Sequence, residues 1–390
     1  MKFIEVNSPA LELEFLKVHD AMNCENPNWI KPLNKDVLEV FDKSKNKHLQ
    51  HGEAVRWFLQ NEKGESIGRI AAFVNKRYKN KGDTFPVGGI GFFDCINDQK
   101  AADLLFEKAK IWLAEKGMKA MDGPINFGDR DKWWGLLVDG FHEPIYNMNY
   151  NPPYYQSLFE GYGFQVFYNQ ICWALEVASE QNQLSAKFYE SHAKYFYDPD
   201  FTVKYLKKNK LVDFAKDLST VYNKAWAKHE GNKEISHQHA LKLLESMKPI
   251  LDEKLIWFAY HKGEPIVMWI NLPDINQVIK HLNGKFGLWE KLKFLFFKTF
   301  GKNRNFVGIV FGIVPEFQGK GLDYYLIVEA EKEIKKTRHY KKLELYWQGD
   351  FNPKILNISK NLGGKQSRRM VTYRYLFDRY QKFERHPILS

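Results

Sequence analysis

The chain has 390 residues and a formal net charge of +11, with 44% hydrophobic and 16% aromatic residues. This composition suffices for packed cores and excludes a disordered protein, and the length suggests two domains. No apolar run approaches the roughly 20 residues that cross a bilayer, residues 1–9 lack the pattern of a signal peptide, and the three cysteines lie far apart, so we expect a cytoplasmic protein with reduced thiols.

Basic residues are spread along the chain, with one concentration at 204–210. Such charge can serve nucleic acid, an anionic membrane face or an anionic cofactor. It usually forms a solvated surface, so we do not expect nucleic-acid binding. The twelve histidines show no ligand spacing beyond His237 and His239, which a helix would point in two directions, and no metal site is expected.

The first half of the chain shows alternating strand and helix patterns. Strands are predicted at 2–6, 54–60, 66–74, 88–96, 119–125 and 165–177, and helices at 11–21, 101–116 and 153–160. The second half repeats this order, with strands at 201–206, 255–261, 265–272, 306–314, 342–347 and 368–377, and helices at 211–227, 237–251, after 321 and at 352–362. This repetition indicates an internal duplication, with domains at 1–178 and 201–390, a linker at 179–200 and an insertion at 283–300.

The stretch 305–325 carries the clearest functional signal. An apolar strand ends at Pro315, the turn Gln318-Gly319-Lys320-Gly321 follows, and a helical pattern begins at Leu322. Glycines let a ligand approach the backbone, and the free N–H groups of a first helical turn bind phosphate. The spacing matches neither a nucleoside-triphosphate loop nor a dinucleotide fingerprint. A glycine turn without any ligand is the alternative interpretation.

This turn resembles the pyrophosphate loop of the GNAT superfamily of acetyltransferases, in which an Arg/Gln-x-x-Gly-x-Gly/Ala pattern cradles the diphosphate of acetyl-CoA. Gln318 fits the first place and Gly321 the fourth, whereas Asp323 stands where a small residue is usual. The resemblance covers nearly the whole chain and implies an α+β fold of two tandem GNAT-like domains, each a mixed, mostly antiparallel sheet flanked by helices. The matching turn of the first half has no glycine and carries Asp98, so that copy is expected to be degenerate.

The resemblance implies acetyl-CoA or another acyl-CoA as a substrate of the second domain. The expected CoA contacts, from the pantetheine arm through the pyrophosphate to the next helix start, are Ile313, Val314, Gln318, Gly319, Lys320, Gly321, Leu322, Asp323 and Asn352. Lys320 could equally be a solvent-exposed turn lysine.

Candidate catalytic residues lie on the strand and helix that follow. The family's tyrosine acid corresponds to Ser359, a much weaker acid, and in the first half to Phe159. Glu344 and Tyr346 lie two apart on one strand and so share a face. Glu344 could serve as a base, although an ion pair with a lysine is the alternative, and Asp350 is a second candidate base.

Two unusual segments complete the prediction. The segment 126–151 could line an acceptor cleft with Asn126, Asp129, Arg130 and Trp134, with Asp129 or Asp131 holding an amine, or it could join the domains. The basic, aromatic stretch 288–300 could lie on a membrane, but we favour a lid over the fold.

From these residues we expect an acyl-CoA-dependent N-acyltransferase, acetyl transfer being the first expectation, acting on a small-molecule or peptide amine. The alternatives are a non-catalytic acyl-CoA binder and an aminoacyl transferase of the cell-wall type. The regular pyrophosphate loop argues against the aminoacyl transferase, because transferases of that type typically lack such a loop. The sequence does not predict the oligomeric state.

Overall fold

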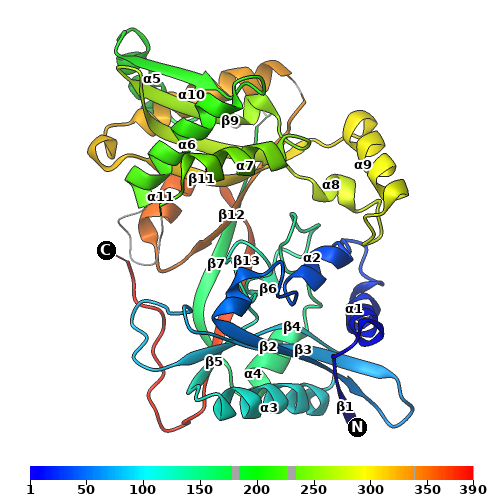
Figure 1. Cartoon of the computed structure of the whole chain (residues 1–390). Coiled ribbons are helices and arrows are strands. Elements are labelled where there is room, and N and C mark those ends of the chain that lie inside the picture. Colours follow the sequence, from blue (N-terminus) through cyan, green and yellow to red (C-terminus); the bar gives the residue numbers. More distant parts are fainter. Residues whose placement is uncertain (178–183, 227–233, 338, 390) are drawn as a thin grey trace.

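The structure is a computed structural model that describes residues 1–177, 184–226, 234–337 and 339–389. Its two halves, each a sheet with helices on both faces, lie one above the other in Figure 1. The first residues of the predicted linker, 179–183, lie outside the described part of the chain.

The strands of both halves form one mixed sheet, in the order β1-β2-β3-β4-β5-β13-β7-β12-β11-β10-β9-β8. The first half contributes β1 (Lys2–Glu5), β2 (Gly52–Gln60), β3 (Ser66–Asn75), β4 (Val87–Cys95), β5 (Ala120–Gly123), β6 (Leu136–Asp139), which pairs with β13, and β7 (Gln165–Glu176). The second half contributes β8 (Phe201–Tyr205), β9 (Ile256–His261), β10 (Glu264–Pro273), β11 (Asn305–Ile313), β12 (Lys342–Gly349) and β13 (Lys365–Leu376). Among the described strands, β4–β5 and β11–β12 pair in parallel and the other pairs are antiparallel, so the predicted mixed, mostly antiparallel sheet is confirmed.

Helices cover both faces of each half. They are α1 (Pro9–Asn23), α2 (Asn34–Glu39), α3 (Gln99–Glu115), α4 (Tyr155–Tyr162), α5 (Ala186–Phe196), α6 (Leu211–Trp226), α7 (His237–Met247), α8 (Asn276–Ile279), α9 (Leu288–Phe300), α10 (Leu322–Thr337) and α11 (Pro353–Asn361). Several begin where a side chain caps the first turn: Ser8 accepts from Leu11 N–H in α1, and Asn352 accepts from Ile355 N–H in α11. In the second half, α6 and α7 pack on one face of the sheet and α5 and α10 on the other.

The two halves exchange their last strands. β13, from the second half, lies between β5 and β7 of the first half, and β7 pairs with β12 of the second half. In Figure 1, β7, β12 and β13 run through the middle of the molecule and connect the two layers. The halves are therefore joined through backbone hydrogen bonds as well as by the chain between them.

Candidate active site

The second half opens where β11 and β12 part. The two strands pair only over Asn305–Gly308 and Lys342–Leu345. Beyond this point β11 remains paired with β10 alone, and Ile309 bulges out because Ile270 opposes Val310 while Asn271 opposes Gly308. A bulge frees backbone groups and aims a strand away from its neighbour, so it leaves a wedge-shaped opening between β11 and β12.

A cavity of about 690 Å³ lies at this opening. Its wall is formed by β11, by α6 and α7, by the end of β10 and by residues 129–147 of the first half. Most of the wall is apolar, and representative side chains are Leu218, Leu244, Met247, Ile270 and Val310. Its size and apolar lining are typical of a small-molecule site with few polar groups.

Asp274 is the buried carboxylate in this cavity. It is 4% exposed, and its Oδ1 accepts a hydrogen bond from Asn276 N–H at 3.1 Å. Burial raises the pKa of Asp274 to about 7, and the negative charge of Glu344 adds to this increase. A carboxyl group with that pKa can accept a proton at neutral pH. Asp131 also lines the cavity, and its pKa is raised by partial desolvation of its carboxyl group and by the charge of Asp129. The residue as a whole is exposed to solvent, unlike Asp274.

The glycine turn lies at the far end of β11. Gly319 and Gly321 have φ angles of 71° and 80°, a conformation that favours glycine. Within the described part of the chain, the N–H groups of 319–322 have no hydrogen-bond acceptor. Gln318 Nε2 donates to Ile313 O at 3.2 Å, and Lys320 is exposed. The turn therefore offers free amides beside a lysine, as an anion site requires.

Helix α5, which lies within the predicted linker, packs beside this turn. Tyr195 OH donates to Lys320 O at 2.7 Å, and a Cβ atom added to Gly321 would lie 2.4 Å from Ser191 Oγ. Asp323 has a raised pKa because burial outweighs the hydrogen bonds from the N–H groups of Asp323 and Tyr324. Its carboxylate thus caps α10 itself, and the amides left for a phosphate are those of 319–322.

Glu344, the predicted base, is not among the residues that line the cavity. Arg368 Nε donates to Glu344 Oε1 at 2.7 Å, and the Arg368 side chain is fully buried. Although burial opposes ionisation, the charge of Arg368 lowers the pKa of Glu344 to about 2. A carboxylate with so low a pKa is a poor base, which favours the ion-pair alternative. The predicted lysine partner is Lys342, whose Nζ lies 3.5 Å from Glu344 Oε2, and Arg368 is a second, closer partner.

The other predicted catalytic residues are engaged by neighbours. Ser359 is 1% exposed and exchanges two hydrogen bonds with the side-chain amide of Gln348, at 2.8 and 3.0 Å. Tyr346 lines the cavity and donates to Asp131 O, and burial raises its pKa well above the ordinary value. Of these two, Tyr346 is the one placed to contact a ligand.

The predicted acceptor residues are distributed around the cavity rim and the core. Asp129 lines the cavity. Asn126 lies in an adjoining hollow, and Arg130 donates to Asn80 at 3.0 Å. Trp134 is 2% exposed and donates to Tyr168 OH at 2.8 Å, so it packs the first half. The segment lines the cavity and also contacts the second half, because Tyr346 OH and Trp347 Nε1 of β12 donate to the backbone oxygens of Asp131 and Arg130.

The matching opening of the first half is filled by its own chain. β4 and β5 pair only over 87–89 and 120–122, after which Ile125 N–H donates to Ile90 O at 2.7 Å. A Cβ atom on Gly91 would lie 2.0 Å from Ile125 O, and Asp98 caps α3 by accepting from Lys100 N–H. No room is left there for a pantetheine arm.

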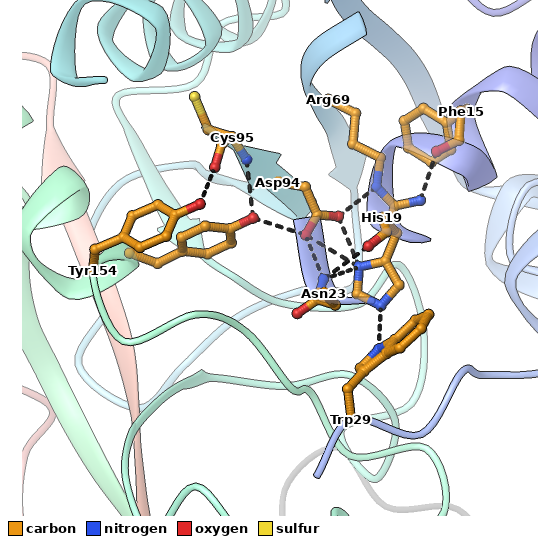
Figure 2. A network of polar contacts seen from close by, with 9 residues as sticks. Phe15, His19, Asn23, Trp29, Arg69, Asp94, Cys95 and Tyr154 are labelled. Carbon is orange, nitrogen blue, oxygen red and sulfur yellow. Dashed lines mark hydrogen bonds and ion pairs between the residues drawn. The ribbon is translucent and has the colours of Figure 1, made fainter. Parts of the chain in front are cut away.

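A polar network closes the same region, as Figure 2 shows. Asp94 on β4 receives Arg69 Nε at 2.6 Å, lies 2.9 Å from His19 Nδ1 and accepts from Tyr155 OH at 3.0 Å. Trp29 Nε1 donates to the other ring nitrogen of His19. Despite full burial, His19 and Arg69 lower the pKa of Asp94 to about 2. The neighbouring cavity measures only about 50 Å³, so we assign this network to the stability of the first half.

Metal-ligand clusters and membrane-spanning helices are both absent from the described residues. No group of three or more His, Cys, Asp or Glu side chains there could hold a metal ion. Among the same residues, no helix combines the length and apolar character needed to span a membrane.

Asp274 and the α7 side chains of the cavity were not among the sequence-predicted site residues. The only local signal was an acid directly after the apolar strand that ends at Pro273. The cavity that contains Asp274 is lined by residues as distant in sequence as Asp129, 145 positions earlier in the chain.

Comparison with known proteins agrees with this architecture. No family model matches the chain. The bacterial ceramide synthase of Caulobacter vibrioides (strain NA1000 / CB15N) is 25% identical over 96% of this chain and 97% of its own length. Protein YghO of Escherichia coli (strain K12) is 23% identical over 92% of this chain and 91% of its own length.

Two solved structures share the fold. A tandem GNAT protein from the clavulanic acid biosynthesis pathway superposes with a TM-score of 0.52 at 9% identity, over 96% of this chain and 98% of that one. A glucosamine N-acetyltransferase region of a fungal multi-domain β-N-acetylglucosaminidase superposes with a TM-score of 0.54 at 12% identity, over 96% of this chain but 38% of that protein.

Proposed function

We propose that this chain, which has the fold of the GNAT superfamily, is an acyl-CoA-dependent N-acyltransferase whose acceptor is an amine carried on a long apolar chain. The observation that carries the proposal is the apolar cavity at the parting of β11 and β12, with Asp274 inside it. A site that bound only an acetyl group would need a much smaller apolar lining than this cavity has.

The cavity and the glycine turn lie along one strand. From Ile313, beside the turn, to Ile309, at the cavity, four residues of β11 span about 13 Å at roughly 3.3 Å per residue. A pantetheine arm that followed β11 from the turn would bring its thioester to the bulge at Ile309. The free amides of 319–322 and Lys320 would hold the pyrophosphate.

Asp274 would act as the general base. The amine nitrogen attacks the thioester carbonyl carbon, a C–N bond forms, the C–S bond breaks, and CoA leaves as the thiolate. The proton of the attacking nitrogen passes to Asp274, whose pKa of about 7 suits this role. Positioning of the two substrates would supply the rest of the rate increase.

The Caulobacter relative supports the choice of acceptor. It is named a bacterial ceramide synthase, and a ceramide is the amide of a fatty acid with a long-chain amino alcohol. Both reactants that form such an amide carry long apolar chains, which match the apolar lining of the cavity. We therefore propose a long-chain acyl-CoA as donor, in place of the acetyl-CoA expected first from the sequence.

The direct test is thiol release from a long-chain acyl-CoA with a series of amines. Cys24 is exposed and would react with a thiol reagent, whereas Cys95 and Cys172 are buried, so the Cys24→Ser variant gives the lower background. We expect release with long-chain 2-amino alcohols to exceed that with short amines or glucosamine by about tenfold or more, since each buried methylene adds to binding. Calorimetric binding of acyl-CoA without release for any amine would indicate a non-catalytic binder, and absence of binding would refute the proposal.

A charge reversal at the turn tests the CoA site separately. Lys320→Glu is expected to raise the Kd for CoA by about tenfold, because a carboxylate replaces a cation beside the pyrophosphate. Gly321 is a poor target, because any side chain there would meet Ser191. The matched control is Lys63→Glu, at an exposed hairpin tip of the first half. Equal Kd values for both variants by calorimetry would place the CoA site elsewhere.

A further inference from the structure

The exposed surface of α9 has an unusual composition. Its large side chains that face solvent are Leu288, Trp289, Leu292, Leu295, Phe296 and Phe300, which are 52–77% exposed. The helix has no buried residue. A single exposed apolar residue is ordinary, whereas a continuous patch of this kind marks an interaction site.

The helical geometry places these side chains on one face. At 100° per residue, positions 288, 289, 292, 295, 296 and 300 fall within an arc of about 140°. The opposite side holds the helix to the protein: Phe294 packs against Phe286 with ring centroids 6.0 Å apart, and Phe297 stacks on His281 at 3.9 Å. The larger apolar face therefore points away from the fold, while the opposite side, which carries Phe294, covers a hollow of the fold as the predicted lid would. Figure 1 shows α9 at the edge of the molecule.

Basic residues flank this apolar face. On the same wheel Lys291 lies to one side of the arc and Lys293 to the other, and both are exposed. Within 285–304 the chain carries six Lys or Arg residues and one acid, Glu290. An exposed apolar arc between lysines is the pattern of a helix that lies in the interface of an anionic bilayer.

The helix also stands beside the route to the cavity. Phe294 and Lys298 line a second hollow of about 630 Å³. This hollow and the candidate active-site cavity share Ile250, Pro273 and Ile275. A membrane bound by α9 would thus lie next to a hollow of mixed polar and apolar lining that adjoins the candidate active-site cavity.

We infer that α9 docks the protein on the surface of an anionic membrane, with its outer face inserted among the acyl chains and its lysines at the headgroups. This docking does not depend on the proposed reaction. If the reaction is as proposed, docking brings the candidate active site close to a membrane that holds apolar substrates.

Co-sedimentation with vesicles tests this inference on the full chain. Vesicles of phosphatidylglycerol and phosphatidylcholine in equal parts should bind the protein more strongly than phosphatidylcholine alone. The Leu292→Glu/Phe296→Glu variant is expected to lower the partition coefficient by about tenfold or more. The Lys291→Gln/Lys293→Gln variant should lower it about fivefold for each lysine, on anionic vesicles only.

The matched control is Leu104→Glu/Ile111→Glu on α3, whose side chains are 41% and 48% exposed. It should bind vesicles like the wild type, and all variants should keep the wild-type Tm because the replaced groups are exposed. Binding that is unchanged by the α9 substitutions would overturn the inference. A second outcome would also overturn it: light scattering shows that the wild type is a dimer, the α9 substitutions dissociate this dimer, and vesicles bind neither form. The face of α9 would then contact a second copy of the chain.

Discussion

Replacing Asp274 by asparagine is expected to lower the rate of acyl transfer by about 10²–10⁴-fold, the usual contribution of a general base. Asparagine has nearly the same shape, and its Oδ1 can still accept the hydrogen bond from Asn276 N–H that Asp274 accepts at 3.1 Å. The loss should appear in kcat, with little change in the Kd for acyl-CoA, because Asp274 would act only after both substrates are bound.

The pH dependence distinguishes a base from a residue that only shapes the site. A base acts in its ionised form, so the wild-type rate should rise with pH through about 7, the pKa of Asp274, and then level off. The Asp274→Asn variant should lack this rise. A variant that kept both the rise and the rate would rule out Asp274 as the base.

The same group should weaken the fold at high pH. Its pKa rises from 3.8 to about 7 on folding because it is buried, so the folded state retains a proton that the unfolded state has lost. Stability should therefore fall as pH rises from about 4 to 7, by up to roughly 4 kcal/mol. Above pH 7 the Asp274→Asn protein should unfold at higher denaturant than the wild type.

Asp217 offers a matched control for that measurement. Burial raises its pKa too, but its carboxylate accepts a hydrogen bond from Tyr260 at 2.6 Å and does not line the cavity. Asp217→Asn should change stability and leave kcat near the wild-type value. If both substitutions lowered kcat alike, the effect of replacing Asp274 on kcat would be structural.

Local sequence predicted much of the fold and missed the partners of its strands. The helix expected at 101–116 is α3, Gln99–Glu115, because its apolar spacing and the Asp98 cap are local signals. The strand expected at 368–377 largely coincides with β13. Its alternating pattern, however, does not predict that it pairs with strands of the first half. Helix α5 was missed within the predicted linker, although Phe188 and Tyr195 are buried on its inner face.

The candidate site likewise has parts that the sequence predicted and parts that it did not. The glycine turn was visible because a strand, two glycines and a helix start are adjacent in sequence. The cavity was not, because its wall combines segments of both halves. Glu344 could be judged only when its partner Arg368 was seen, since a pKa of about 2 depends on that contact.

Replacing Arg368 by methionine is expected to cost up to about 3–5 kcal/mol of the free energy of unfolding, because it removes the closest and fully buried cation from buried Glu344. Lys342, 3.5 Å from Glu344 and partly exposed, remains as the weaker partner. Arg368 also donates to Glu143 O at 3.0 Å, so it ties β13 and β12 to the segment that borders the cavity. Denaturant unfolding measures the loss. The control is Arg385→Met, whose ion pair with Asp350 is about half exposed and should contribute less than about 1 kcal/mol.

Replacing both Glu344 and Arg368 tests whether the loss of stability comes from leaving a buried charge unpaired. In the Glu344→Gln/Arg368→Met variant much of the stability should return, because no buried charge is left unpaired. The wild type should also lose stability as pH falls from about 4.5 to 2, since Glu344 has a lowered pKa in the folded state, and the double variant should not. A single variant within about 1 kcal/mol of the wild type would contradict this account.

The double variant also connects this ion pair to the proposed base. Glu344 raises the pKa of Asp274 more than Arg368 lowers it. Removing both charges should therefore lower the pH at which acyl transfer reaches half its maximal rate, while the buried position of Asp274 keeps that pH well above the ordinary range of a carboxyl group. An unchanged or raised midpoint would show that the base titrating in the pH profile is some other group.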